Sequence, residues 1–194
     1  VSFANALYAI CLVFGMGISF ALPPLISEAQ GAVDDRRISS YFKHSLIVNL
    51  AFGVISMILL VAFIPFMKYL GQDPEIIPHA ADYMYYSALG MIPFMIFQTL
   101  RCYSDGLSET LPSMIIIILG NLLNVILNYL LIFGHWGLPE MGTAGAALSS
   151  LISRVFMVFG ILIIFRHWKN LWIYLSEVRF NMYKSSYFKK ILSL

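Results

Sequence analysis

The sequence has few charged residues. Only 11% of its 194 residues are Asp, Glu, Lys or Arg, against roughly a quarter in ordinary soluble domains. Hydrophobic residues make up 60% of the chain. A soluble domain of this length needs a charged surface that this composition does not supply, so lipid must cover much of the chain. The net charge of +2 is too small to indicate a nucleic-acid partner.

Residues that build enzyme and metal sites are also scarce. The two cysteines, Cys11 and Cys102, lie in apolar stretches, and we expect buried thiols without a disulfide. The four histidines are scattered among connections and span ends, and none pairs with another at metal-ligand spacing. The chain has neither a phosphate-binding glycine loop nor a nucleophile elbow. We therefore expect a protein that is not an enzyme and that holds no cofactor.

Long apolar runs are the main feature of the sequence. Five stretches approach the roughly 20 residues that cross a bilayer, at about 3–26, 46–67, 83–100, 111–133 and 143–165. Each run is continuous rather than alternating, which argues against the strands of a barrel. In lipid such a run must be helical, because an open backbone finds no hydrogen-bond partner there. The sequence predicts an all-α integral membrane protein with five transmembrane helices.

The basic residues are distributed very unevenly between the two sides of these helices. Lys68 stands alone on one side, and Arg154 lies within the last span. The other side carries Arg36, Arg37, Lys43, Arg101, Arg166, Lys169, Arg179, Lys184, Lys189 and Lys190. Because cytoplasmic loops are enriched in Lys and Arg, we expect the loops near 28–44 and 101–111 and the C-terminal tail to be cytoplasmic.

The start of the sequence suggests that a further segment precedes it in the intact protein. The chain opens at Val1 inside an apolar run, and an odd number of spans with a cytoplasmic end starts outside. An intact protein that begins in the cytoplasm would need a further helix before Val1.

The tail 167–194 is basic and aromatic, which favours an amphipathic linker on the inner leaflet over a nucleic-acid-binding segment.

Three asparagines share one face of the fourth span. Asn121, Asn124 and Asn128 project within about 60° of one another at 100° per residue. Unsatisfied amides in hydrocarbon are costly, so this face must meet polar partners or a wet cavity. Two interpretations stand at this point: the amides hydrogen-bond to a neighbouring helix and hold the bundle together, or they form a substrate or ion site.

Arg154 lies about halfway along the fifth span, too deep for its side chain to reach the interface. We expect it to face the bundle interior or a wet cavity, and we favour a structural anchor to backbone carbonyls or to an acidic partner. The small residues before it favour close helix packing. They form two rows at a spacing of four, Gly142, Ala146 and Ser150 in one and Gly145, Ser149 and Ser153 in the other.

Four strings, in order and at consistent separations, carry a family resemblance over nearly the whole chain. They are Glu28–Asp35, Leu70–Glu75, Asn124–Gly134 and Gly137–Ala147. Together they resemble the multidrug and toxic compound extrusion (MATE) family. That resemblance implies helices two to six of a six-helix N-terminal lobe, with the first helix and a C-terminal lobe lying outside this sequence.

The resemblance also implies a function and a site. Members export cationic and amphipathic compounds across the inner (plasma) membrane in exchange for protons or sodium ions. Asn124 and Asn128 match polar positions of the N-lobe cation or proton site, so a sodium ion could bind near them. Asn121, Ser150 and Gln98 are further cavity-lining candidates. Some members carry an acid where Asn128 stands, and the family's first-helix aspartate lies outside this chain.

Other functions remain as alternatives. A lipid-linked oligosaccharide flippase of the same superfamily usually has more basic residues in its cavity, and here Arg154 alone qualifies. A membrane enzyme would need His, Asp or Glu residues converging at one depth, which the scattered positions disfavour. In a non-transporting membrane scaffold, the asparagine face would serve only to join helices.

Overall fold

The computed structural model describes residues 2–69, 77–137, 140–168 and 171–173. Within these ranges the chain is helical and contains no strand, which confirms the all-α fold class. The α-helices are α1 (Ser2–Ser19), α2 (Leu22–Gly31), α3 (Asp35–Phe63), α4 (Ile77–Leu89), α5 (Met91–Gly106), α6 (Leu111–Phe133) and α7 (Gly142–His167). Two short 3-10 helices are η1 (Ile64–Tyr69) and η2 (His135–Gly137).

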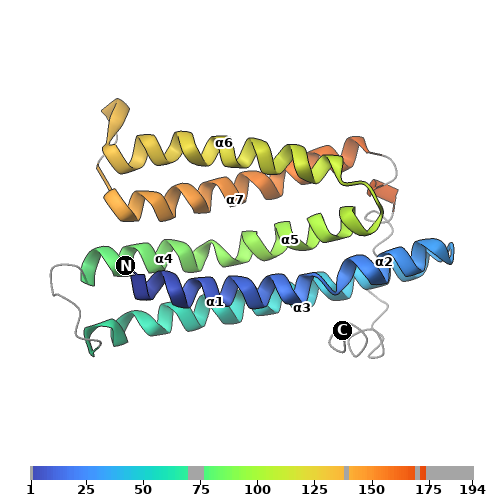
Figure 1. Ribbon diagram of the computed structural model, residues 1–194, viewed down its shortest axis with the longest axis horizontal. Coiled ribbons are helices and arrows are strands. Elements are labelled where there is room, and N and C mark those ends of the chain that lie inside the picture. Colours follow the sequence, from blue (N-terminus) through green and yellow to red (C-terminus); the bar gives the residue numbers. More distant parts are fainter. Residues whose placement is uncertain (1, 70–76, 138–139, 169–170, 174–194) are drawn as a thin grey trace.

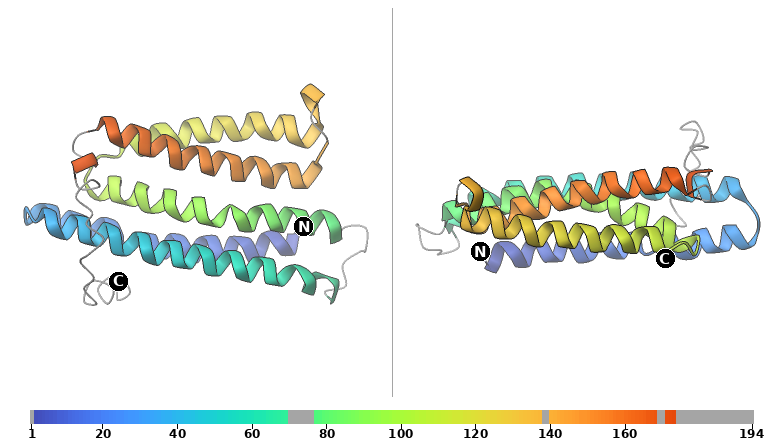
Figure 2. Two further views of the ribbon diagram at one scale, coloured as in Figure 1. Left: turned by 180° about the vertical axis from the view of Figure 1, so that it is seen from behind. Right: turned by 90° about the horizontal axis from the view of Figure 1, so that it is seen from above.

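The helices lie roughly side by side along one long axis (Figures 1 and 2). α6 and α7 form a tightly packed antiparallel pair. α4 and α5 follow one another along one line between that pair and a second layer that contains α1 and α3. α7 also packs on α4 and α5, so α4 and α5 join the α6–α7 pair to the second layer. The bundle therefore consists of long helices aligned along one axis, as in a membrane-spanning protein.

The fourth and fifth predicted spans agree closely with the structure. α6 covers Leu111–Phe133, the predicted range, and α7 covers Gly142–His167 where 143–165 was expected. Local chemistry explains the ends of α6. Pro112 sits in the first turn, where its missing N–H has no helical partner to lose. Gly134 follows the last turn with φ 68°, the left-handed conformation that ends helices and favours glycine.

The first predicted span, 3–26, is one apolar segment made of two helices. α1 ends at Ser19 and α2 begins at Leu22, with Pro23 in its first turn. The ring of a proline clashes with the carbonyl four residues earlier, and for Pro23 that residue is Ser19. The segment is therefore interrupted between Ser19 and Leu22. The helix continues to Gly31, beyond the expected end.

The predicted span 83–100 is divided between two helices. The structure divides this segment between α4, of 13 residues, and α5, of 16 residues, with the break at Gly90. Pro93 lacks the N–H that would bond to Leu89, the last residue of α4. Neither helix crosses a bilayer core of about 30 Å alone, but residues 77–106 together reach about 45 Å at 1.5 Å per residue.

Four other helical segments among the described residues are long and apolar enough to cross a membrane. They are Asn5–Gly31, Asp35–Met67, Leu111–Phe133 and Gly142–His167. α4 and α5 are the remaining pair, and they run alongside these segments through the bundle (Figure 1). The five predicted membrane crossings thus correspond to four such segments and one broken pair.

The segments expected to be loops near 28–44 and 101–111 are mostly helical. α3 begins at Asp35 rather than at 46, because Asp34 caps its N-terminus. Asp34 accepts a hydrogen bond from the Arg37 backbone at 3.2 Å, and their side chains form an ion pair at 3.0 Å. α5 likewise continues to Gly106, which leaves four residues before α6. Hydropathy detects the part of a helix that suits lipid, while capping decides where the helix itself begins.

Two clusters of buried apolar side chains hold the bundle together. One joins α2, α3, α5 and α7 and contains Ile26, Phe42, Tyr103 and Phe165. The other joins α1, α3, α4 and α5 around a run of methionines. Large apolar side chains also remain exposed along the outer faces, among them Ile118, Leu122 and Val125 on α6 and Val13 and Phe14 on α1. Those faces have the character of a surface in contact with lipid.

The predicted interfacial tail, 167–194, lies largely outside the described residues. His167 ends α7, and Trp168 follows it. The indole Nε1 of Trp168 donates to Glu109 Oε2 at 3.1 Å, and the Tyr103 hydroxyl donates to the carbonyl oxygen of Leu171 at 2.8 Å. The end of α7 is therefore held against the α5–α6 connection. Of the two cysteines, Cys102 is buried, Cys11 is partly buried, and both are free thiols.

The close approach of α6 and α7 depends on a small residue at position 145. A Cβ atom on Gly145 would lie 2.6 Å from the carbonyl oxygen of Leu131 and 2.8 Å from its carbonyl carbon. Those atoms belong to the α6 backbone, which cannot rotate away as a side chain would. Ser149 and Ser153, in the same row as Gly145, are also buried. The row of small residues is therefore the packing face of α7.

We predict that Gly145→Leu separates α6 from α7 and lowers stability by about 1–3 kcal/mol, the usual cost of overpacking. Gly17→Leu is the matched control, since nothing lies within 4 Å of a Cβ added there. Melting temperatures of the purified variants in detergent measure the difference. Equal melting temperatures for the two variants would show that the α6–α7 contact is not tight.

Candidate functional site

A cavity of about 340 Å³ opens between α1, α5, α6 and α7. Small-molecule sites typically enclose about 300–1,000 Å³. Its lining combines apolar and polar residues. The apolar residues are Met16, Phe94, Phe97, Ile117, Gly120 and Met157. The polar residues are Gln98, Arg101, Asn121, Asn124, Ser150, Ser153 and Arg154.

The structure brings most of the residues predicted from the sequence to this cavity. Gln98, Asn121, Asn124 and Ser150 all line it, and so does Arg154. They come from three consecutive helices, α5, α6 and α7. Gln98 is 2% exposed, whereas Asn121 is exposed. The polar positions on α5, α6 and α7 thus face one common space.

Asn128 does not line the cavity, although it belongs to the same face of α6. Its Nδ2 donates to Asn124 Oδ1 at 3.0 Å, one turn earlier. Asn124 Nδ2 in turn donates to Ser150 Oγ at 3.4 Å, and Ser149 Oγ donates to Asn128 Oδ1 at 2.5 Å. The two amides and two hydroxyls form a hydrogen-bonded network between α6 and α7. This network extends from the cavity wall into the helix interface.

The geometry satisfies both interpretations of the asparagine face. The hydrogen bonds from Asn124 and Asn128 to the two serines join the helices, as in other membrane bundles. The same contacts gather four neutral oxygen atoms, and an amide oxygen has two lone pairs, so one remains after each bond described above. Neutral oxygens of this kind suit a hard cation such as sodium. No group of three or more His, Cys, Asp or Glu that could hold a metal occurs in the part of the chain that the structure describes.

Arg154 anchors α7 to the helix break between α4 and α5. Its Nη1 donates to the carbonyl oxygen of Gly90 at 3.4 Å. The guanidinium lies 5.4 Å from the centre of the Tyr8 ring and 5.1 Å from the centre of the Phe94 ring. These distances allow cation–π attraction to both rings. One side chain therefore contacts α1, α5 and the residue between α4 and α5.

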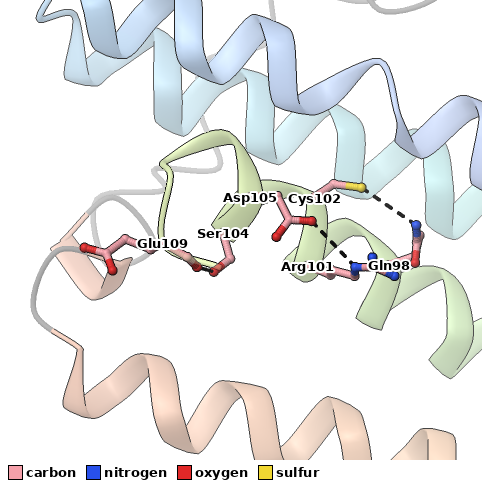
Figure 3. A network of polar contacts seen from close by, with 6 residues as sticks. All are labelled: Gln98, Arg101, Cys102, Ser104, Asp105 and Glu109. Atoms are coloured by element: carbon pink, nitrogen blue, oxygen red, sulfur yellow. Dashed lines mark hydrogen bonds and ion pairs between the residues drawn. The ribbon is translucent and has the colours of Figure 1, made fainter. Parts of the chain in front are cut away.

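The polar edge of the cavity continues along α5 toward its C-terminus (Figure 3). Arg101 Nε lies 3.6 Å from Asp105 Oδ2, one turn further on. Gln98 Nε2 is directed at the Cys102 sulfur, at 3.8 Å. Ser104 Oγ donates to the carbonyl oxygen of Glu109 and so closes the turn after α5. The charges of Arg101 and Asp105 therefore compensate one another at this end of α5.

Sequence reasoning missed three polar residues of the site: Arg101 and Ser153, which line the cavity, and Ser149. Arg101 was assigned to the cytoplasmic loop, because its charge counted toward the orientation of the chain. Its spacing of three from Gln98 places both on one helix face, which was a usable signal. Ser149 was assigned to packing, yet it contacts Asn128. Its partner could not be inferred, because the facing of two helices depends on tertiary structure.

Comparison with known proteins identifies the family. A family model described as MatE matches residues 1–130, about two thirds of the chain. The chain belongs to the MATE family. The multidrug resistance protein NorM of Photobacterium profundum is 29% identical over 84% of this chain. A probable multidrug resistance protein NorM of Synechocystis is 32% identical over 82% of it. The resemblance inferred from the sequence strings is therefore confirmed.

A solved structure supports the MATE fold. It is described as the inward-facing conformation of a multidrug resistance MATE family transporter, and the likeness covers 98% of this chain and 42% of the other, with a TM-score of 0.79 at 22% identity. The chain spans about a third of the length of the curated relatives it matches, 36% of the Photobacterium protein and 35% of the Synechocystis protein. It is thus a multi-pass membrane chain of a transporter family rather than of an enzyme family.

We predict a measurable coupling between Asn128 and Ser149. A double-mutant cycle of Asn128→Ala and Ser149→Ala should give about 0.6 kcal/mol, the mean for hydrogen bonds between membrane helices. The control cycle pairs Asn121→Ala with Ser149→Ala and should give a coupling near zero, because Asn121 lies two turns from Asn128. The free energy of unfolding in mixed micelles is the measurement. Equal coupling in the two cycles would contradict the network.

Proposed function

We propose that these helices belong to a secondary active antiporter that exports drugs or other cationic or amphipathic compounds in exchange for protons or sodium ions. Membership of the MATE family supports this, as do the names of relatives that confer multidrug resistance. The observation that carries the proposal is the cavity between four apolar helices, with amide and hydroxyl groups from three of them in its lining. Such a space suits the binding of an amphipathic molecule inside a membrane bundle.

The place of the chain within the transporter is part of the proposal. The helices correspond to helices two to six of an N-terminal lobe in the inner membrane. The loops after α2 and after α5 face the cytoplasm, since most Lys and Arg residues flank them. The bilayer is the solvent for the exposed faces of α1 and α6. The N-lobe wall of the transport pathway would then run along α5, α6 and α7.

The α6–α7 network is the proposed cation site. Asn124 Oδ1, Asn128 Oδ1 and the two serine hydroxyls supply neutral oxygens. A sodium ion needs only such ligands. A proton needs a base, and the lining residues that the structure describes include no carboxylate. Proton coupling would therefore draw on an acidic side chain elsewhere in the transporter, with the amides orienting it.

We predict that Asn124→Ala and Asn128→Ala in the gene-encoded protein each abolish drug resistance while the protein still reaches the membrane. Each substitution removes one oxygen ligand of the network. Asn5→Ala on α1 is the matched control and should keep resistance, because Asn5 is exposed and bonds only to the Tyr83 hydroxyl in the described contacts. Growth in the presence of drug and membrane abundance are measured together. Full resistance in both α6 variants would contradict the site.

We further predict that one imposed cation gradient drives substrate movement in everted vesicles. Separate sodium and proton gradients identify the coupling ion, because each can be collapsed by its own ionophore. Asn128→Ala should lose the response to the effective gradient. Substrate movement that follows neither gradient would contradict antiport.

A further inference from the structure

Aromatic side chains gather at the C-terminal end of α6 and in the turn that follows it. Tyr129 and Phe133 lie in the last turns of α6, and His135 and Trp136 belong to η2. We propose that these four residues, the α6 aromatic surface, bind the headgroup region of the bilayer and fix the depth of α6 in it. The inference involves neither the transported compound nor the coupling ion.

Three of the four rings pack on one another. The His135 ring stacks on the Tyr129 ring with centroids 4.5 Å apart, and the Phe133 ring lies 6.0 Å from Tyr129 and 6.2 Å from His135. The Tyr129 hydroxyl lies 3.3 Å from His135 Nε2. All three side chains are nevertheless exposed. These contacts hold the rings in place without covering them.

Trp136 projects beyond this stack. Its side chain is 91% exposed, and its backbone has φ 60° and ψ 29°, in the left-handed region. That conformation costs energy for a bulky residue, and glycine or asparagine would adopt it more easily. The indole recovers little of this cost by burial against the described chain. An observed backbone outlier supports a functional hypothesis, and here it points to a partner beyond these helices.

The length of α6 places the α6 aromatic surface at a membrane boundary. The 23 residues of α6 extend about 35 Å at 1.5 Å per residue, slightly more than a hydrocarbon core of about 30 Å. Exposed side chains along its middle are aliphatic, among them Ile118, Leu122 and Val125. The aromatic rings follow where the helix would leave the hydrocarbon. Tyr and Trp are enriched at that level, where their amphipathic rings sit among the headgroups.

A second aromatic pair lies at the same end of the bundle. Figures 1 and 2 show η1, which follows α3, and η2 at one end of the long axis, on opposite edges of the bundle. The Phe63 and Phe66 rings have centroids 6.2 Å apart, and Phe66 is exposed. Exposed rings on two separate connections at one end are expected of a bilayer interface. A contact with one protein partner would account for one connection alone.

The headgroup region supplies what the α6 aromatic surface needs. The N–H of an indole requires a hydrogen-bond acceptor once the ring leaves water, while the ring itself favours an apolar contact. Phosphate and ester oxygens lie beside the first acyl carbons, so one lipid layer satisfies both demands. A dry contact with a second copy of the chain would bury the polar tips of these rings at a cost. The chemistry of the surface therefore favours lipid.

A fixed depth of α6 has a consequence for the polar residues that it carries. Asn128 precedes Phe133 by five residues, which is about 8 Å along a helix. The α6–α7 network would then keep a constant distance from the headgroups on this side of the membrane.

The test reads the depth of the Trp136 indole. In the gene-encoded protein every other tryptophan is replaced by phenylalanine, and the purified protein is placed in phosphatidylcholine nanodiscs. One lipid carries bromine near the glycerol end of an acyl chain, another carries it near the methyl end, and acrylamide quenches from water. We expect the shallow bromine to quench Trp136 emission most, because bromine acts at short range.

Three outcomes of this experiment would overturn the proposal. Stronger quenching by the deep bromine would place the Trp136 indole in hydrocarbon. Quenching by acrylamide as complete as that of free tryptophan would place it in water. Quenching by none of the three would show that protein covers the ring, either another part of the transporter or a second copy.

Phe14→Trp on α1 is the matched control, made in the protein that also carries Trp136→Phe. Phe14 is 66% exposed and lies well inside the apolar segment Asn5–Gly31. The indole introduced there should be quenched most by the deep bromine. The same order of quenching at both positions would contradict a special depth for Trp136 and overturn the proposal.

A single conservative substitution guards against a multiply substituted protein that does not fold. Trp136→Phe in the otherwise unaltered protein removes one exposed indole and keeps an aromatic ring. The emission that this substitution removes, taken as the difference between the two proteins, should show the same preference for shallow bromine. A difference signal that acrylamide alone quenches would overturn the proposal. Because no step measures transport, this inference and the antiport proposal can fail independently.

Discussion

Inside a membrane bundle, each polar group must find its partner within the protein, because hydrocarbon offers none. This constraint decides how α6 and α7 face each other. The amides of Asn124 and Asn128 meet Ser149 and Ser150, which turns the apolar side chains of α6 outward. Gly145 allows the backbones to approach closely enough for those contacts. The polar residues of α6 and α7 that line the cavity belong to this same interface, where the two helices do not close over them.

The helix break between α4 and α5 is subject to the same constraint. Pro93 removes the N–H that would bond to the Leu89 carbonyl oxygen. Arg154 on α7 donates to the next carbonyl oxygen, that of Gly90, which also accepts from the Phe94 backbone at 3.2 Å. A charge at membrane depth thus meets a backbone oxygen beside the break. This contact also decides where the Arg154 guanidinium lies in the candidate site. The anchor fixes the guanidinium on the wall that also carries Gln98 and Asn124.

Expectations from the sequence succeeded where one helix contains the whole signal. The bounds of α6 and the shared face of its three asparagines follow from an apolar run, Pro112, Gly134 and the helical period. They failed where the signal was local chemistry inside or beside an apolar run. Asp34 starts α3 well before the apolar run begins, and the 83–100 segment breaks at Gly90 although its composition is continuous. Hydropathy reports suitability for lipid, whereas caps and prolines set the ends of helices.

The sequence alone determined that the chain is a helical membrane protein with amides and an arginine at membrane depth, because burial cost and helical period act within single segments. Tertiary structure decided which of these groups meet. It placed Asn124 and Gln98 on one cavity, left Asn128 in the helix interface and brought Arg101 into the lining. The rotation and approach of neighbouring helices depend on packing between residues far apart in the chain, and no single segment carries that information.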